Sequence, residues 1–543
     1  MRYIIGIDLG TTNSCVSYVD TQDPRATIQS FKIPQLVIEG SFEHLPTLPS
    51  ACYLAAPQEF PKGALNLPWD HHLNFFVGKF ALQQGAKIPT RLVQSAKSWL
   101  CHSAANRRDK ILPLESDNEE MRISPVEATA RYLKHIREAW NHNMARGDVE
   151  SEFEGQEIIL TVPASFDEIA RSLTVEAARL AGFDKMNLLE EPQAAFYSWI
   201  SQHEKDWEKH LSAGSTVLVC DVGGGTTDFS LIEVVVKEGA LTFQRMAVGD
   251  HLLLGGDNMD AAIAHRLEIL LEEEKHVLSR IQRLRLRHEA RNAKEALLKE
   301  NKGDAEHELY RVLLQGSGSN VIQGALSVTL HAAEVRKSLI EGFLGGYSWA
   351  EALQLKKTAG FRSMGLPYAD EPSITKHLAH FLSSNAGDDH QPKKPDFVLF
   401  NGGAMKPPLF QQAIIDNLKA WFGKEVSVLP SYNLDLAVAR GAAYYGKVRQ
   451  GMGVRIGGGM ARGYYLLLDT KDEQGLVVSK AMTLLPRGSE DGSSFEPETT
   501  FQLKPNTPVV FQIATSHVRL HDLAGDLIDV DPKEMQMLPP IQT

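Results

Sequence analysis

The sequence predicts an α/β protein with two lobes, followed by a small β-rich region. A buried strand that ends in an aspartate and a glycine turn occurs twice, at residues 4–14 and 217–228. Between residues 158 and 192, strand-like and helix-like segments alternate, which is the mark of a layered α/β domain. After residue 464, short alternating segments separated by Pro and Gly indicate further strands.

The repeated turn predicts a polyphosphate site between the two lobes. Asp8 and Asp221 end the two strands and lie 221 − 8 = 213 residues apart, a suitable length for one lobe of a duplicated fold. The glycines leave room for an anion beside the main chain, and such a turn directs several N–H groups toward phosphate oxygens. Aspartates at these strand ends can hold hydrated Mg²⁺. Either copy alone could be a structural turn, whereas the pair indicates a ligand.

Composition excludes several classes of protein. The chain has 543 residues and a formal net charge of −12, which argues against general binding to nucleic acids or anionic membranes. Its four cysteines show no CxxC spacing, so neither a zinc site nor a disulfide framework is predicted. They fit a reducing, cytoplasmic setting. Asp8 interrupts the first apolar run before it reaches the length of a signal peptide, and no run is long enough to span a bilayer.

The first 150 residues predict strands, then loops, then helices. Residues 15–19 continue as a strand, and the many prolines between 20 and 75 predict loops and short edge strands. Residues 91–100 have a helical pattern that contains Lys97. A helix is predicted over 124–143, because Ser124 and Glu127 form a capping box at its start.

Residues 158–192 supply the alternating part of the first lobe. A strand over 158–163 stops at a proline, and Ser165 with Glu168 predicts a capping box for a helix that ends at Gly182. A strand over 186–189 leads to Glu191, whose following proline can begin a helix.

The second lobe contains a long charged segment. From residue 260 to about 299 the pattern predicts one long helix with an apolar stripe. Four arginines at 280, 283, 285 and 287 could contact nucleic acid, but nearby glutamates favour a solvated helix face. Residues 397–403 predict a buried strand before two glycines, and residues 436–448 predict a helix of small residues packed closely against the glycine turns.

A glycine-rich segment over 451–463 marks a boundary. The triplet at 457–459 has no preceding strand and no following GKS or GKT, so a flexible connection is favoured over a phosphate-binding loop.

Taken together, these motifs resemble the heat-shock 70 kDa (DnaK-type) chaperone family over about residues 1–450. They occur in the family's order at residues 5–14, 221–228, 191–192, 255–257, 402–403 and 435–443. The resemblance implies an actin-like ATPase domain of duplicated ribonuclease-H-like units over 1–450, with lobe I at about 1–214, lobe II at about 215–430 and a closing helix at 434–448. The region 464–543 is only loosely similar to the start of the family's peptide-binding domain.

The resemblance also assigns roles to individual residues. It implies that Asp8 and Asp221 hold Mg²⁺ through water. The residues with catalytic roles would be Lys97, Glu191, Thr226 and Asp228. The residues that bind nucleotide would be Gly10, Thr11, Thr12, Asn13, Gly223, Gly224, Gly225, Thr226, Gly255, Gly256, Lys294, Gly402, Gly403, Lys406 and Asp435.

The chain departs from the family where the base should bind. The family's adenosine-binding helix has a glutamate, a lysine and a serine where this chain has Arg291, Lys294 and Leu298. After the third glycine turn the family has a serine and a stacking arginine, whereas this chain has Ala404 and Lys406. Lysine does not stack as arginine does. We therefore expect intact phosphate contacts and altered base recognition.

The function implied by the resemblance is Mg²⁺-dependent ATP hydrolysis in which lobe closure is coupled to a peptide or partner. ATP or ADP, Mg²⁺ and K⁺ are the implied ligands, and unfolded peptide, client proteins and co-chaperones are the implied partners of a cytoplasmic monomer. Two alternatives stay open: a nucleotide-binding scaffold with little hydrolysis, and an actin-like small-molecule kinase, since fold does not settle function.

Overall fold

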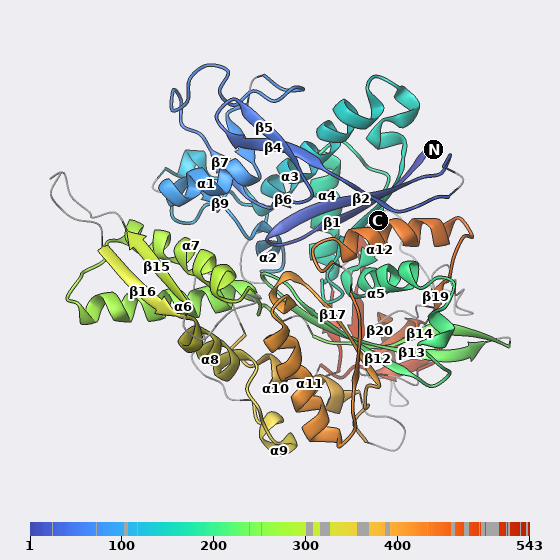
Figure 1. Ribbon diagram of the computed structural model, residues 1–543. Helices are drawn as coiled ribbons and strands as arrows, with labels where there is room; N and C mark the ends of the chain where they lie inside the picture. Colours follow the sequence, from blue (N-terminus) through green and yellow to red (C-terminus); the bar gives the residue numbers. More distant parts are fainter. Residues whose placement is uncertain are drawn as a thin grey trace. The chain divides into compact units, whose positions relative to one another are not determined.

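The computed structural model of the chain contains two compact units (Figure 1). The first consists of Met1–Trp207, Val217–Phe229 and Gly249–Gly453. The second consists of Glu208–Thr216, Ser230–Val248 and Val454–Thr543. The structure describes residues 1–23, 25–71, 73–102, 107–116, 118–237, 239–250, 252–299, 308–314, 326–355, 369–385, 391–431, 433–457, 462–471, 477–487, 489, 495, 510–516, 519, 522–532, 534–538 and 541–542.

A six-stranded sheet forms the centre of the first half of the first unit. Its strand order is β11-β10-β1-β2-β3, and β6 pairs with β2. Strand β1 pairs in parallel with β10 and antiparallel with β2. The bounds are β1 Tyr3–Leu9, β2 Asn13–Asp20, β3 Gln29–Phe31, β6 Leu48–Pro49, β10 Glu157–Val162 and β11 Asn187–Glu190.

The same strand pattern recurs in the second half of this unit. There the strands β12 (Thr216–Val222), β17 (Phe397–Asn401) and β18 (Ser427–Leu429) run parallel in the order β18-β17-β12. This order matches β11-β10-β1, so Asp8 on β1 and Asp221 on β12 occupy equivalent places. The duplication predicted from the two turns is therefore present in the strand topology.

Helices cover both faces of the first sheet. Ile5 and Ile7 of β1 share a core with Leu133 of helix α3 (Pro125–Trp140) and with Leu173 of α4 (Glu168–Leu180). On the other face, α12 (Ala437–Arg449) lies along β1 and packs on α5 (Glu191–Gln202), as Figure 1 shows. A Cβ on Gly6 would collide with the α12 backbone at Ala439 and Ala443. Contact with β1 and α5, rather than with the glycine turns, therefore explains why α12 is built from small residues.

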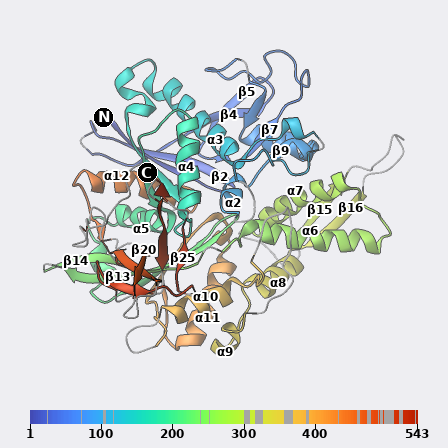
Figure 2. The ribbon, with the colours of Figure 1, turned by 180° about the vertical axis from the view of Figure 1, so that it is seen from behind.

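The long helix predicted over 260–299 is in fact two helices. Helix α6 (Gly256–Glu273) ends before Lys275, whose φ of 65° is left-handed, and Ser279 caps the start of α7 (Arg280–Leu297). The two helices pack on one another beside the hairpin of β15 (Leu309–Leu314) and β16 (Leu326–His331), as Figure 2 shows. Of the four arginines, Arg280 pairs with Glu115 and Arg283 with Glu268.

Two further predictions for the first unit, the start of one helix and the capping residue of another, are wrong. The helix expected from residue 91 begins at Ala96, because Pro89–Arg91 is a 3₁₀ turn and Leu92–Val93 is strand β9. Helix α4 is capped by Asp167, whose side chain accepts from Ala170 N, and not by Ser165. The other bounds are β4 Ile33–Ile38, β5 Ser41–Leu45, β7 Cys52–Leu54, β8 Phe75–Val77, α1 Lys79–Lys87, α2 Ala96–Leu100, α8 Ala332–Phe343, α9 Trp349–Ala352, α10 Ile374–Ser384 and α11 Pro408–Phe422.

The second unit is β-rich, as the sequence predicts. Strand β13 (Thr227–Lys237) enters it at Ser230 and pairs with β14 (Ala240–Val248), which pairs in parallel with β19 (Ile456–Gly457). A five-stranded sheet has the order β24-β21-β20-β23-β25. The bounds are β20 Gly463–Lys471, β21 Val477–Leu485, β22 Val510–Phe511, β23 Ile513–Ser516, β24 Leu527–Asp529, β25 Gln536–Met537 and β26 Ile541–Gln542. The second and third glycines of the triplet at 457–459 lie outside the described residues.

No helix in the part of the chain that the structure describes has the length and apolar character needed to cross a bilayer.

Candidate nucleotide site

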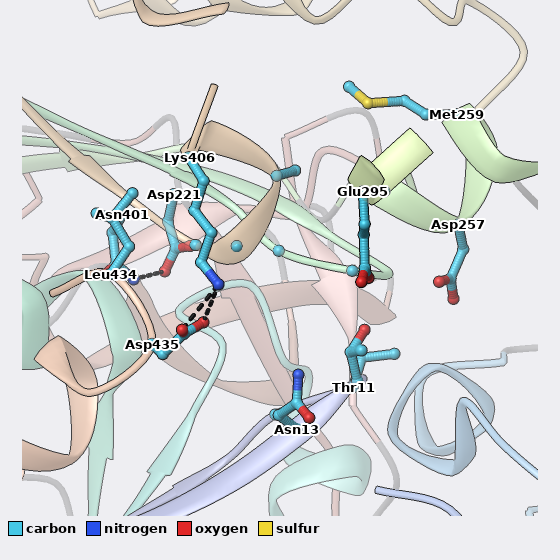
Figure 3. Close-up of a pocket in the computed structure, with 18 of the residues that line it drawn as sticks. Thr11, Asn13, Asp221, Asp257, Met259, Glu295, Asn401, Lys406, Leu434 and Asp435 are labelled. Atoms are coloured by element: carbon cyan, nitrogen blue, oxygen red, sulfur yellow. Dashed lines mark hydrogen bonds and ion pairs between the residues drawn. The ribbon is translucent and has the colours of Figure 1, made fainter. Parts of the chain in front are cut away.

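The first unit contains a cavity of about 620 Å³ that both glycine turns line (Figure 3). Most of the residues predicted for the site lie on its wall. They are Asp8, Gly10, Thr11, Thr12, Asn13, Lys97, Glu191, Asp221, Gly223, Gly224, Thr226, Gly256, Lys294, Gly402, Gly403, Lys406 and Asp435. Gly225, Asp228 and Gly255 are absent from the lining residues.

The first turn connects β1 to β2 and is fixed by Ser50. The Ser50 hydroxyl donates to the Gly10 carbonyl at 2.7 Å, and the Ser50 N–H donates to the Thr12 carbonyl at 2.8 Å. Gly10 is required here, because an added Cβ would overlap the carbonyl oxygen of Asn13. The turn thus presents Thr11, Thr12 and Asn13 to the cavity on a fixed backbone.

The second turn is held by the start of α6. Gly223 N–H donates to the Thr226 carbonyl at 2.9 Å and closes the turn. The N–H groups of Gly256 and Asp257 donate to the carbonyls of Gly223 and Gly224 at 3.0 and 2.7 Å. A Cβ on Gly255 would lie 2.7 Å from the Gly223 oxygen. Gly255 therefore acts by allowing α6 to approach the turn.

The two turns face each other closely. A Cβ on Gly224 would overlap the side chain of Thr12, and a Cβ on Gly225 would lie 2.9 Å from Thr11 Cγ2. This approach brings the duplicated motifs together as the sequence predicts. Gly225 contributes through close packing, since it is not a lining residue.

The strand β17 adds a polar contact beneath the second turn. Asn401 lies opposite Asp221 in the parallel register, and its amide donates to the Asp221 carboxylate at 2.8 Å, as Figure 3 shows. Gly402 follows with a φ of 84°, and a Cβ there would overlap the Val222 carbonyl. This glycine is needed for both backbone conformation and space.

A buried ion pair lies at the side of the cavity. Lys97 on α2 forms it with Glu191, the first residue of α5, and both side chains are about nine-tenths buried. Burial lowers the pKa of Lys97, but Glu191 and Asp8 together raise it above its usual value. The lysine is therefore a fixed positive charge inside the cavity.

Three aspartates near this lysine are shifted toward the protonated form: Asp221 and Asp228 are buried, and Asp8 is partly buried. Burial and the Glu191 charge raise the pKa of Asp8 to about 7, despite the opposing effect of Lys97. Burial and Glu191 raise the pKa of Asp221 well above its usual range. Burial raises the pKa of Asp228 to about 6, although Ser165 and Lys97 act against it. The acids outnumber the cation beside them, so the group can accept a further positive charge.

The donor chemistry fits Mg²⁺ held through water. Asp8 and Asp221 offer the hard carboxylate oxygens that Mg²⁺ prefers, and Mg²⁺ commonly keeps several of its waters. In the described part of the chain, no group of three or more His, Cys, Asp and Glu side chains could cage a metal directly.

Asp228 lies just behind the wall of the cavity. Its carboxylate accepts a hydrogen bond of 2.5 Å from the Ser165 hydroxyl. Ser165 was predicted to cap α4, and this different role explains why Asp167 caps the helix instead. Asp228 and Lys97 influence each other electrostatically.

A charge network lies at the part of the cavity formed by α6 and α7. Arg291 contacts Asp257 at 2.6 Å and Asp260 at 2.9 Å, and Lys294 contacts Asp260 at 2.6 Å. Asp257 also accepts from the Ser95 hydroxyl at 3.0 Å. Arg291 and Lys294 are thus held by acids of the protein itself.

Lys406 is held in a similar way on the opposite side. Its ammonium lies 2.7 Å from the carboxylate of Asp435, as Figure 3 shows. Leu298 and Ala404, which stand where the family has serines, also line the cavity. The departures noted in the sequence therefore gather in one cavity with the two turns.

The model of the Hsp70 protein family matches residues 79–323 of the chain. The match supports the Hsp70 family. It also supports the actin-like ATPase superfamily, and the mixed α/β fold with several sheets is consistent with it.

The matched segment contains much of the site. Lys97, Glu191, the second glycine turn and α7 lie within residues 79–323, whereas the first turn and Gly402 lie outside. The Hsp70 family generally binds ATP or ADP with Mg²⁺ and has ATPase activity. The match therefore supports a chaperone-type ATP-binding protein.

Some site residues were not identified from the sequence. Asn401 and Ser95 are the clearest, since one contacts Asp221 and the other Asp257. A signal for Asn401 existed, because it ends a strand just before the third glycine pair. Ser95 carried no such signal, because its contact depends on a residue 162 positions away.

Proposed function

We propose that this chain binds ATP between its two glycine turns and hydrolyses it to ADP and phosphate in a Mg²⁺-dependent reaction. The Lys97–Glu191 ion pair carries this proposal, because it fixes a cation in the cavity that both turns line. Phosphoryl transfer depends mainly on positioning and on neutralising negative charge. The cavity offers both, together with the carboxylates of Asp8 and Asp221, which can accept positive charge.

In this proposal each residue has a distinct task. A water oxygen bonds to the γ-phosphorus while the bond from phosphorus to the bridging oxygen of ADP breaks, and the water's protons stay on the phosphate that is released. Lys97 stabilises the charge on the transferring phosphoryl group, and Glu191 holds the lysine in place. Thr226 contacts the γ-phosphate, and Asp228, oriented by Ser165, helps to place the attacking water.

Asp8 and Asp221 would hold Mg²⁺ through its waters, and the ion would supply positive charge to the phosphate oxygens. The N–H groups of the two turns bind the remaining phosphate oxygens. The similarity of the two strand arrangements supports this symmetrical role of the aspartates.

We infer further that residues 1–450 act as one nucleotide-binding domain and that 464–543 form a β-rich domain that binds peptide or a partner. Closure of the two lobes on ATP would change the affinity of that domain. The Hsp70 match over residues 79–323 supports the nucleotide-binding part of this proposal. Measuring the binding of an unfolded peptide with ADP and with ATP tests it, and equal affinities would contradict the coupling.

Phosphate release from purified full-length protein tests the catalytic part. We expect Mg²⁺-dependent release without any added acceptor, which distinguishes hydrolysis from a small-molecule kinase. Thr226→Ala should slow release about 100-fold, the usual effect of losing one electrostatic donor. Glu341→Gln, on the exposed face of α8, should have no effect. Tight ATP binding without any release would instead indicate a nucleotide-binding scaffold.

A further inference from the structure

The part of the cavity that the phosphate turns do not form is lined by α6, α7 and the segment after β17. Its apolar members include Met259, Leu298 and Phe410, which are all buried in the protein. Pro407 and Pro408 continue this surface. Apolar walls of this kind suit the flat faces of a purine, so the polar residues among them decide which base edge is accepted.

Most charged groups in this part are already engaged. Arg291 and Lys294 contact Asp257 and Asp260, and Lys406 contacts Asp435. Their ammonium and guanidinium groups are therefore balanced by carboxylates of the protein.

Glu295 differs from these residues. It lines the cavity and is exposed, and its charge acts on Arg291, which lies one helical turn earlier. Figure 3 shows its carboxylate pointing away from α7 into the cavity. Lys299, four residues later, lines the same cavity. A carboxylate acceptor and an ammonium donor thus both lie on the cavity wall that a bound base would meet.

This pair of groups complements guanine. A carboxylate only accepts hydrogen bonds, and it can accept two at once from neighbouring donors. Guanine offers two neighbouring donors, N1–H and the N2 amino group, beside the acceptor O6. Adenine offers one amino donor beside the acceptor N1, whose lone pair a carboxylate repels. Glu295 can accept both guanine donors while Lys299 donates to O6.

We propose that Glu295 makes this cavity a site for guanine nucleotides as well as for adenine nucleotides. The proposal rests on the proposed function, because it concerns the base of the same bound nucleotide. The phosphate turns contact no part of the base, so they bind both nucleotides alike. For guanine, the hydrogen bonds that its edge makes with Glu295 then offset the binding energy that is lost because a stacking arginine is absent.

Calorimetric titration of the full-length protein with Mg²⁺·GDP and Mg²⁺·ADP tests this. We expect the two Kd values to agree within tenfold. Glu295→Gln should weaken GDP about tenfold relative to ADP, because a carboxamide loses the second acceptor and suits adenine better. The matched variant Glu341→Gln, on α8, should leave both Kd values unchanged.

Three results would overturn the proposal. The first is GDP binding more than tenfold weaker than ADP binding in the unaltered protein. The second is equal weakening of both nucleotides by Glu295→Gln, which would place the carboxylate at the sugar. The third is no effect of that substitution. If ADP binds and ATP is hydrolysed, these results leave the proposed function intact, whereas failure of both nucleotides to bind overturns both proposals.

Discussion

The ammonium group of Lys97 and the carboxylate of Glu191 form a buried ion pair between helix α2 and the first residue of α5. The two residues lie 94 positions apart in the chain, and both line the cavity between the glycine turns. The pair links the proposed catalytic cation to a second element of the fold. Its removal should therefore affect both stability and rate.

Lys97→Met should destabilise the protein by about 3 kcal/mol, because it leaves the Glu191 charge buried and unpaired. The double variant Lys97→Met with Glu191→Gln should recover much of this loss, since the Glu191 charge is then removed together with its partner. Urea unfolding of both variants measures the difference. Equal stability of the single and double variants would contradict the buried pairing.

The stability of the ligand-free protein should depend on the protonation of Asp8. Its pKa in the folded protein is about 7, above the ordinary value of 3.8, because of burial and Glu191. The protonated form is therefore favoured by folding. The stabilisation that the protonated Asp8 carboxyl gives the folded protein is fully present below pH 4. It is lost as the pH rises toward 7.

Asp8→Asn removes this loss of stability. At pH 8 the free energy of unfolding of the variant should therefore be about 1–3 kcal/mol higher than that of the unaltered protein. At pH 4 the two proteins should differ little. Urea unfolding without nucleotide or Mg²⁺ measures both values, with Asp184→Asn at an exposed loop position as the control. A gain of the same size at both pH values would contradict the raised pKa.

Gly402 and Gly403 provide a matched pair of substitutions. Gly402→Ala should cost about 2–4 kcal/mol, because its φ of 84° is left-handed and the Val222 carbonyl occupies the space of the methyl group. Gly403→Ala should change stability by less than about 0.5 kcal/mol, since nothing lies within 4 Å of the added atom. Thermal unfolding of both variants tests the turn geometry, and similar losses would show that it is wrong.

The two glycine turns after Asp8 and Asp221 show what the sequence could predict. In each turn a strand, an aspartate and a glycine are contiguous, so their arrangement follows from local chemistry. The equivalent positions of Asp8 and Asp221 could therefore be predicted. Residues 260–299 are helical almost throughout, but the break near Lys275 lacks a glycine or proline as a signal. The sequence alone consequently indicated one helix.

Individual side-chain hydrogen bonds between distant segments were beyond prediction. Ser165 looks like a cap because Glu168 follows three residues later, yet its hydroxyl is bonded to Asp228, which is 63 residues away. Ser95 contacts Asp257 across 162 residues. Such contacts depend on how the elements pack, which no local pattern specifies.

The Ser95 contact yields its own prediction. Ser95→Ala should lower stability by about 1 kcal/mol, because the buried Asp257 loses a donor. Ser98→Ala is the matched control, since the Ser98 hydroxyl is buried without a hydrogen bond among the described residues. Unfolding measurements on the two variants show whether the hydrogen-bonded Ser95 hydroxyl contributes more to stability than the Ser98 hydroxyl. A larger loss of stability from Ser98→Ala would contradict the hydrogen bond between Ser95 and Asp257.

The most direct test of the account is single-turnover hydrolysis of ATP by excess full-length protein with saturating Mg²⁺. Single-turnover conditions separate chemistry from binding and product release. We predict conversion of the bound ATP to ADP and phosphate, slowed about 100-fold or more in the double variant Lys97→Met with Glu191→Gln. Bound ATP that stays intact in the unaltered protein, or equal rates in the two proteins, would contradict the proposed role of Lys97.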